Sequence, residues 1–287
     1  MRGVESTQVS RRSFLVGGGL CGVCAVAGFF AGRRTSATTP STPVAIAVPI
    51  PGAETLTTRE RQAAQPDGLF RVPTTEPIVA LSFDDGPDPL YTRAVLDLLA
   101  KNSIRATFFS VGVNAIAAPD LVRQLLDAGH SVGNHTFDHR ELELLTVEEV
   151  QTEIEKGQTA LMSTGIPRPK LFRPPKGYTD EVVGVIADAD RYRTVFWDGC
   201  VEHFVNHQPV ADGVAQLVAK TRPGSILLAH DGGAIVGSGR SPISRARTMQ
   251  ALPMLLEGLR RKGLDVVDIP TLLVRTKTPL LPRPAPR

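Results

Sequence analysis

The sequence contains little cysteine, and this limits how the chain can be stabilised. Only three cysteines occur in 287 residues. Two of them, Cys21 and Cys24, lie in an apolar stretch near the N-terminus. Cys200 is therefore the one cysteine of the predicted folded part, and an intrachain disulfide is excluded there.

Three other features are missing or weak. The glycine pair Gly232-Gly233 lacks the spacing of a phosphate-binding loop. The net charge of +3 is small and does not indicate nucleic acid as a partner. The longest apolar run, over residues 17–31, is shorter than the about 20 residues that a membrane-spanning helix needs.

The N-terminus has the pattern of an export signal. Arg11-Arg12 precedes the Gly- and Ala-rich apolar run, which is the layout of a twin-arginine signal. We expect residues 1–37 to be a twin-arginine signal peptide or an N-terminal anchor; an ordinary membrane anchor with two incidental arginines is the alternative. The protein would then be extracellular, in the cell wall, or anchored and facing outward. Contact with a membrane is expected only through this segment, if it is not cleaved.

Three further regions follow. Residues 38–76 are rich in Thr, Pro and Ala and are predicted to be a linker. Residues 77–272 are predicted to be the folded domain, and residues 273–287 a Pro-rich tail. The oligomeric state is left open.

Strands and helices alternate along the predicted domain. Short apolar runs predict strands over residues 78–83, 104–111, 130–134, 171–172, 193–197, 225–229 and 264–269. Helical periodicity predicts intervening helices, one capped by Thr92 and another opened by the capping box Thr146-x-x-Glu149. About seven strand–helix units favour an α/β fold, a distorted (β/α)7-type barrel, over a doubly wound sheet.

Polar motifs stand at the carboxyl ends of these strands, where such barrels carry their chemistry. Asp84 and Asp85 end the first strand, and His135 and His139 follow the third. Neighbouring strand residues point to opposite sides, so the two aspartates cannot do the same job. Asp85, His135 and His139 have the ligand count of a catalytic zinc site, which keeps a position open for water. A His-x-x-x-His pair alone is more often a surface-helix pair; the upstream Asp-Asp favours the metal site.

The remaining polar residues suggest acid–base chemistry. Asp84 is the candidate general base, and Arg173 the cation that holds it ionised. The alternative, which we favour less, is that Arg173 is a surface residue before a Pro-Pro turn. His230, at the end of a strand, is the candidate general acid.

These motifs resemble those of a known family. The matching stretches are Ser82-Phe83-Asp84-Asp85-Gly86-Pro87, His135-Thr136-x-x-His139, Arg173-Pro174-Pro175-x-Gly177 and Leu228-x-His230. They are similar to the successive motifs of the NodB-type polysaccharide deacetylases, carbohydrate esterase family 4, over about residues 77–270. The resemblance implies a distorted barrel (the NodB homology domain) and one divalent metal, most commonly Zn²⁺, with Co²⁺ possible. It also implies hydrolysis of N-acetyl groups on N-acetylglucosamine-type sugars, or of O-acetyl groups on some polysaccharides.

The resemblance also assigns roles. It implies Asp84 as base, Arg173 as the residue that orients it, and His230 as acid. Asp85, His135 and His139 would hold the metal. Leu228 would line the acetyl pocket, and the backbone N–H near Lys176 would bind the oxyanion. Pro175, Trp197 and Phe204 are expected to contact substrate.

Two departures from the family pattern matter. Lys176 stands where an aromatic residue is common. Cys200, His203 and Phe204 stand where the family usually shows two acidic residues and a tryptophan. One of those acids normally tunes the acid histidine, so the pKa of His230 depends on whether Glu202 or Asp231 substitutes. Cys200 is expected to be a buried small residue, with metal contact as the alternative.

The sequence therefore predicts an exported, metal-dependent hydrolase acting on carbon–nitrogen bonds other than peptide bonds. Its expected substrate is N-acetylated cell-envelope glycan, either peptidoglycan or a chitooligosaccharide-like polymer. An O-acetyl (xylan-type) polysaccharide esterase is one alternative. A weakly active, metal-containing glycan-binding protein is another, disfavoured because such a protein has no need of Asp84, Arg173 and His230 together.

Overall fold

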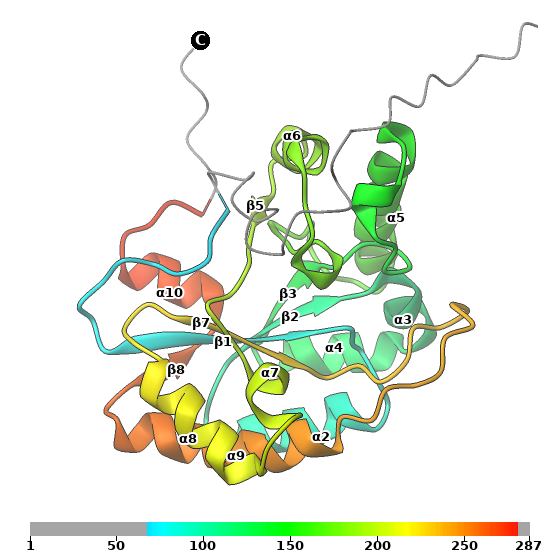
Figure 1. The fold of residues 1–287 in the computed structure, drawn as a ribbon. Coiled ribbons are helices and arrows are strands. Elements are labelled where there is room, and N and C mark those ends of the chain that lie inside the picture. Colours follow the sequence, from blue (N-terminus) through cyan, green and yellow to red (C-terminus); the bar gives the residue numbers. More distant parts are fainter. Residues whose placement is uncertain (1–67, 281–287) are drawn as a thin grey trace, which may run out of the picture. The chain divides into compact units, whose positions relative to one another are not determined.

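A parallel sheet forms the centre of the structure, a computed structural model that describes residues 68–280 (Figure 1). The predicted signal or anchor, most of the predicted linker and residues 281–287 of the tail lie outside the described residues. The strands are β1 (Ile78–Asp84), β2 (Thr107–Ser110), β3 (Ser131–Asn134), β4 (Leu171–Phe172), β5 (Arg193–Thr194), β6 (Gly199–Cys200), β7 (Ile226–His230) and β8 (Asp265–Val267).

The strand order makes this sheet an open, distorted barrel. It runs β5-β4-β3-β2-β1-β7-β6, and every pair is parallel. β8 pairs with residues 78–80 of β1, while β2 pairs with residues 82–84, so the two follow one another along the same edge. Within residues 68–280, β5 and β6 do not pair with each other. The predicted (β/α)7-type barrel is confirmed, and the doubly wound alternative is not.

Helices surround the sheet, and most were predicted. They are α2 (Tyr91–Lys101), α3 (Gly112–Ala117), α4 (Pro119–Asp127), α5 (Val147–Ser163), α6 (Glu181–Ala189), α7 (Val201–Val205), α8 (Val210–Lys220), α9 (Ala246–Arg261) and α10 (Ile269–Arg275), with 3₁₀ turns η2 (Leu142–Leu144) and η3 (Pro175–Gly177). The predicted capping box at the start of α5 is present, because Thr146 and Glu149 bond each other's backbone N–H. The short helices α3, α7 and α10 were not predicted.

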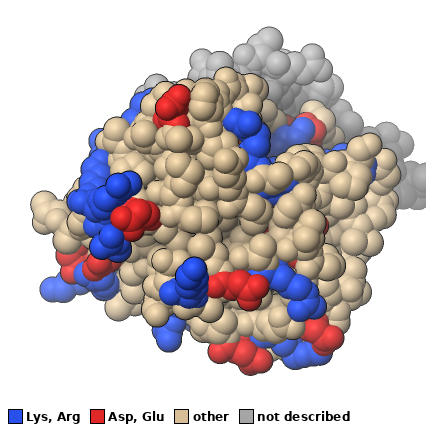
Figure 2. Space-filling view, turned by 90° about the horizontal axis from the view of Figure 1, so that it is seen from below, with Lys and Arg blue, Asp and Glu red and all other residues tan. Residues whose placement is uncertain are grey.

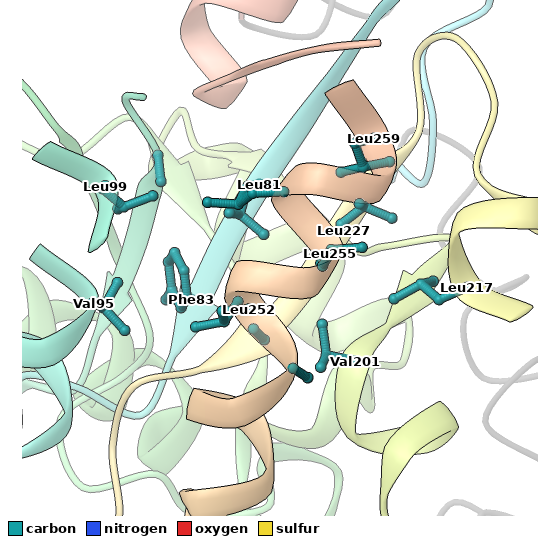
Figure 3. Close-up of a cluster of buried hydrophobic side chains, with 14 of the residues drawn as sticks. Leu81, Phe83, Val95, Leu99, Val201, Leu217, Leu227, Leu252, Leu255 and Leu259 are labelled. Atoms are coloured by element: carbon teal, nitrogen blue, oxygen red, sulfur yellow. The ribbon is translucent and has the colours of Figure 1, made fainter. Parts of the chain in front are cut away.

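The largest apolar cluster lies between the sheet and helices α2, α7, α8 and α9. Figure 3 shows Leu252, Leu255 and Leu259 of α9 lying against Leu81 of β1 and Leu227 of β7. All five are buried, and burying each such side chain contributes about 1.5–3 kcal/mol before the entropy cost. This packing fixes β1 and β7, which carry three of the predicted site residues.

The folded part is longer than predicted at both ends. Leu69 and Val72 are buried, and single bridges join Leu69 to Val195 and Arg71 to Ser225. The chain thus packs onto the barrel before residue 77, inside the predicted linker. At the other end, α10 continues past residue 272 to Arg275.

The surface below the barrel carries mixed charge. Figure 1 shows α2, α8 and α9 there, and Figure 2 shows basic and acidic residues interspersed on this face. Ion pairs such as Arg260 with Glu257, 2.9 Å apart, lie on α9. None of the helices between residues 68 and 280 is both long and apolar enough to cross a membrane.

Candidate active site

β1 brings the two aspartates to the carboxyl end of the sheet. All seven of its residues are buried, and its register places Asp84 directly beside His230 at the end of β7. Asp85 leaves the strand with a left-handed backbone, φ 75°. This conformation is unfavourable for a residue other than glycine and is typical of residues held in place at functional sites. The base and acid candidates are therefore neighbours across one strand pair.

Asp85, His135 and His139 form a cluster that fits a divalent cation. Oδ1 of Asp85 lies 3.2 Å from Nε2 of His139 and 3.6 Å from Nε2 of His135, and one ligand atom from each residue lies within 4.8 Å of the others. Oδ1 has no hydrogen-bond donor among the described residues. Burial alone raises the pKa of Asp85, but the contacts with His135 and His139 outweigh it and hold the pKa well below its ordinary value. The donor set suits zinc or cobalt.

Hydrogen bonds and packing against α5 hold the loop that carries His135 and His139 in place. Thr136 and His139 adopt left-handed backbones. Asn134 accepts a hydrogen bond from the N–H of Thr136, and Thr136 Oγ1 accepts one from the N–H of His139. Gly157 of α5 packs so tightly against this loop that a Cβ there would lie 2.5 Å from Oδ1 of Asn134. Helix α5 therefore supports the candidate metal site through Gly157.

Arg173 links the base candidate to a metal-ligand candidate. Its side chain is fully buried and donates through Nη1 to Asp84 Oδ1 at 2.6 Å. Nε and Nη2 donate to the carbonyls of Val195 and Phe196, so the guanidinium is held on three sides. The Arg173 carbonyl lies 2.7 Å from Nδ1 of His135, which leaves Nε2 free for a cation. The surface-arginine interpretation is wrong.

Glu202 supplies the acidic partner of His230. Its Oε2 lies 3.1 Å from Nδ1 of His230, within ion-pair distance. Oε1 accepts hydrogen bonds from the His230 backbone N–H and from Thr248. Burial alone lowers the pKa of His230, but Glu202 outweighs it and raises the pKa to about 9. Burial works to raise the pKa of Glu202, and the contact with His230 brings it down to about 2.

His203, at the position where the family pattern has its acidic residue, does not contact His230. His203 is exposed, and the neighbouring Glu202 points inward to His230 instead. The other candidate, Asp231, faces Thr92, whose hydroxyl donates to Oδ2 at 2.5 Å. Burial raises the pKa of Asp231 to about 7.

The prediction that Thr92 caps a helix is wrong. Thr92 lies inside the first turn of α2, and its side chain is turned to Asp231. At the N-terminus of α2, Asp88 accepts hydrogen bonds from the backbone N–H groups of Leu90 and Tyr91.

The predicted oxyanion loop is the turn η3. Lys176 has φ 58°, and its backbone N–H has no hydrogen-bond acceptor among the described residues. Its Nζ pairs with Glu141, on the loop that follows His139. The free N–H suits the predicted role in binding an oxyanion.

The predicted substrate contacts fall into two groups. Pro175, at the start of η3, and Leu228, in the middle of β7, are both buried. The ring of Trp197 lies 5.5 Å from the Arg173 guanidinium. Phe204 instead packs against the main apolar cluster, with Lys220 of α8 5.0 Å from its ring. A substrate contact by Phe204 stays a prediction.

Cys200 is not among the clustered donors. Its Sγ lies 3.5 Å from Oε2 of Glu202, and the metal-type cluster contains only the Asp and the two His. Burial raises the pKa of the thiol to about 12, so it stays protonated at neutral pH. The side chain is half-buried, so it is less enclosed than the expected buried small residue, and it is not one of the clustered ligand candidates.

Two residues of the site were missed by the sequence reasoning. Nη2 of Arg245 lies 2.7 Å from Oδ2 of Asp85, and Asn114 donates to the Asp85 carbonyl at 2.8 Å. Arg245 stands at the start of α9, among exposed neighbours, and no local pattern distinguishes it from a surface arginine.

Comparison with known proteins agrees with this geometry. The sequence profile of the family described as Polysaccharide deacetylase matches residues 71–195. A peptidoglycan-N-acetylglucosamine deacetylase of Bacillus cereus is 35% identical over 225 residues, which cover 74% of this chain and 97% of that protein. A chitooligosaccharide deacetylase of Bradyrhizobium is 35% identical over 68% of this chain and 90% of its own length.

A solved structure shows the same fold. It is a peptidoglycan N-acetylglucosamine deacetylase in complex with a naphthyl-substituted N-oxidanyl-benzamide. It superposes with a TM-score of 0.64 at 28% identity, over 72% of this chain and 92% of that one. The chain belongs to the polysaccharide deacetylase family, carbohydrate esterase family 4.

Proposed function

We propose that the protein is a metal-dependent hydrolase that removes N-acetyl groups from N-acetylglucosamine-type glycan of the cell envelope. One observation carries the proposal: the Asp85-His135-His139 cluster, the Asp84–Arg173 pair and the His230–Glu202 pair meet at the carboxyl end of the same sheet. A cation acceptor, a base and an acid within one site are the parts that amide hydrolysis requires.

Each side chain has a distinct task. Asp85, His135 and His139 would hold a divalent cation, which would supply Lewis acidity toward a water and an acyl oxygen. Asp84, paired with Arg173 at 2.6 Å, takes the proton of the attacking water. The N–H of Lys176 donates to the oxygen on which negative charge develops. His230 gives its proton to the departing nitrogen.

The state of His230 favours an amide over an ester substrate. An amine is a poor leaving group unless it is protonated as the bond breaks, whereas an alcohol depends less on an acid. With a pKa of about 9, His230 is protonated at neutral pH and can supply this proton. The esterase alternative rested on an untuned His230, and Glu202 removes that argument.

The substrate class is inferred from the relatives. Those reported above are a peptidoglycan-N-acetylglucosamine deacetylase and a chitooligosaccharide deacetylase. Both names contain an N-acetylated or chitin-type sugar, which agrees with the site chemistry. Export by the twin-arginine route would bring the enzyme to envelope glycan, and it stays a prediction because residues 1–37 lie outside the described residues.

Acetate release tests the proposal. The protein, loaded with Zn²⁺ or Co²⁺, would be given N-acetylglucosamine oligomers, peptidoglycan and O-acetylated xylan, each with and without a chelator. We expect metal-dependent release from an N-acetylated substrate. Release from xylan alone would support the esterase, and bound metal without any release would support the glycan-binding protein.

A further inference from the structure

The two carboxylate oxygens of Asp85 have different surroundings. Oδ1 faces the two histidines and has no hydrogen-bond donor among the described residues. Oδ2 accepts a hydrogen bond from Nη2 of Arg245 at 2.7 Å. One oxygen is thus left for a cation, and the other is already occupied by a guanidinium.

Arg245 is itself fixed in place. Its side chain is only 9% exposed, and its Nε donates to the carbonyl of Gly232 at 2.7 Å. The guanidinium therefore has one contact on the segment that follows β7 and another on Asp85. Because the guanidinium is planar and makes two contacts, both its position and its orientation are fixed.

The segment that anchors Arg245 also presses on the backbone of Asp85. A Cβ on Gly232 would lie 2.2 Å from the Asp85 carbonyl oxygen, so only glycine fits there. Asn114 donates to that same carbonyl and also to the carbonyl of Ala234. The left-handed backbone of Asp85 is held by these contacts, and its side chain by Arg245.

We propose that Arg245 is a positioning residue for the metal site, which presents Asp85 to the cation through Oδ1 alone. This inference rests on the proposed function, because it assumes the Asp-His-His metal site. The terminal torsion of an aspartate is broad, so an unheld carboxylate can turn and offer both oxygens. Engaging Oδ2 limits Asp85 to one donor atom and leaves positions open for water and substrate.

The charge of Arg245 opposes the cation, so the two effects of the residue have opposite signs. Positive charge near the site weakens metal binding, while orientation of the ligand strengthens it. Partners that orient metal ligands typically improve affinity by about 10–100-fold. We expect orientation to prevail, because the guanidinium is directed at Oδ2 and already neutralised by Asp85.

Arg247 provides a control that distinguishes positioning of Asp85 from structural support of α9. Arg247, two residues further along, also bonds main-chain carbonyls. Its Nε and Nη2 donate to Val205, and Nη2 also to Gln208. It contacts none of the metal-ligand candidates in the described structure. Arg245→Gln and Arg247→Gln therefore both remove anchoring contacts at the start of α9, but only the first frees Oδ2.

The experiment measures metal binding, not turnover. Zn²⁺ affinity would be determined by competition with a chromophoric chelator, and ligand geometry by the visible spectrum of the Co²⁺ protein. We expect Arg245→Gln to bind Zn²⁺ about 10–100-fold more weakly and to change the Co²⁺ spectrum, with Arg247→Gln like the wild type in both. Arg245→Lys, which keeps charge without the fork, should fall between, and it serves as the test if Arg245→Gln does not fold.

Three results would overturn the inference. Wild-type affinity and spectrum in both Arg245 variants would show that Oδ2 needs no partner. Equal losses in Arg247→Gln would reduce Arg245 to a structural anchor. A wild-type protein that binds no metal would refute the proposed function and this inference with it, whereas the first two results leave the proposed function intact.

Discussion

Replacing Glu202 by glutamine removes the charge beside His230 while keeping the shape of the side chain. Oε1 can still accept the hydrogen bonds from the His230 N–H and from Thr248. The second oxygen, 3.1 Å from Nδ1, is replaced by an NH₂ group that cannot stabilise the imidazolium. The change therefore acts on the protonation of His230 more than on its position.

The size of the effect follows from the pKa of His230. Burial lowers it and Glu202 raises it, with a net value of about 9 against an ordinary 6.5. Losing an opposite charge at this distance lowers a pKa by about 1–3 units, at about 1.4 kcal/mol per unit. The general acid works in its protonated form, which prevails below the pKa. The alkaline limb of the activity profile should therefore move about 1–3 units toward lower pH.

Two measurements check this prediction. The pH dependence of acetate release would be recorded for Glu202→Gln, and the His230 titration followed by NMR. His203→Gln is the control, since His203 is the adjacent, exposed position that the family pattern would have assigned. An unmoved alkaline limb in Glu202→Gln, or an equal shift in His203→Gln, would refute the assignment of Glu202.

Three further substitutions test the support of the site. Arg173→Met leaves Asp84 buried without its cation and should lower the free energy of unfolding by about 3–5 kcal/mol, measured by urea denaturation; an unchanged midpoint would contradict the role given to the pair. Gly157→Ala forces a Cβ against Asn134 and should lower the free energy of unfolding by about 1–3 kcal/mol and weaken Zn²⁺ binding. Met162→Ala, on the exposed part of α5, should change neither the stability nor the Zn²⁺ affinity. Thr92→Val removes the hydroxyl that donates to Asp231 and should cost about 1–3 kcal/mol, with exposed Thr152→Val as the control; equal melting temperatures for the two variants would show that Asp231 does not need this donor.

The sequence was sufficient where the pattern is local. A continuous apolar run ending in two aspartates predicted β1 and its placement of Asp84 and Asp85. The capping box predicted where α5 begins. The order of the strand–helix units then placed the histidine and arginine motifs at one end of the barrel, because carboxyl ends of parallel strands lie together.

It was insufficient where a contact spans the chain or an element is short. Arg245 and Asp85 are 160 positions apart, and nothing near Arg245 marks it as part of the site. Helix α7 has five residues, which are too few to show a helical period. The sequence therefore did not indicate which side chain, Glu202 or His203, points toward His230. Thr92 fitted the cap pattern, yet the buried Asp231 competes for its hydroxyl.

The measurement that tests the central claim most directly compares metal content with acetate release in two neighbouring variants, Asp84→Asn and Asp85→Ala. If Asp84 is the base and Asp85 a ligand, Asp84→Asn should retain zinc while acetate release falls by about 10²–10⁴-fold. Asp85→Ala should lose both the zinc and the activity. Loss of zinc in Asp84→Asn, or zinc-dependent turnover that survives in it, would contradict the division of labour between the two aspartates.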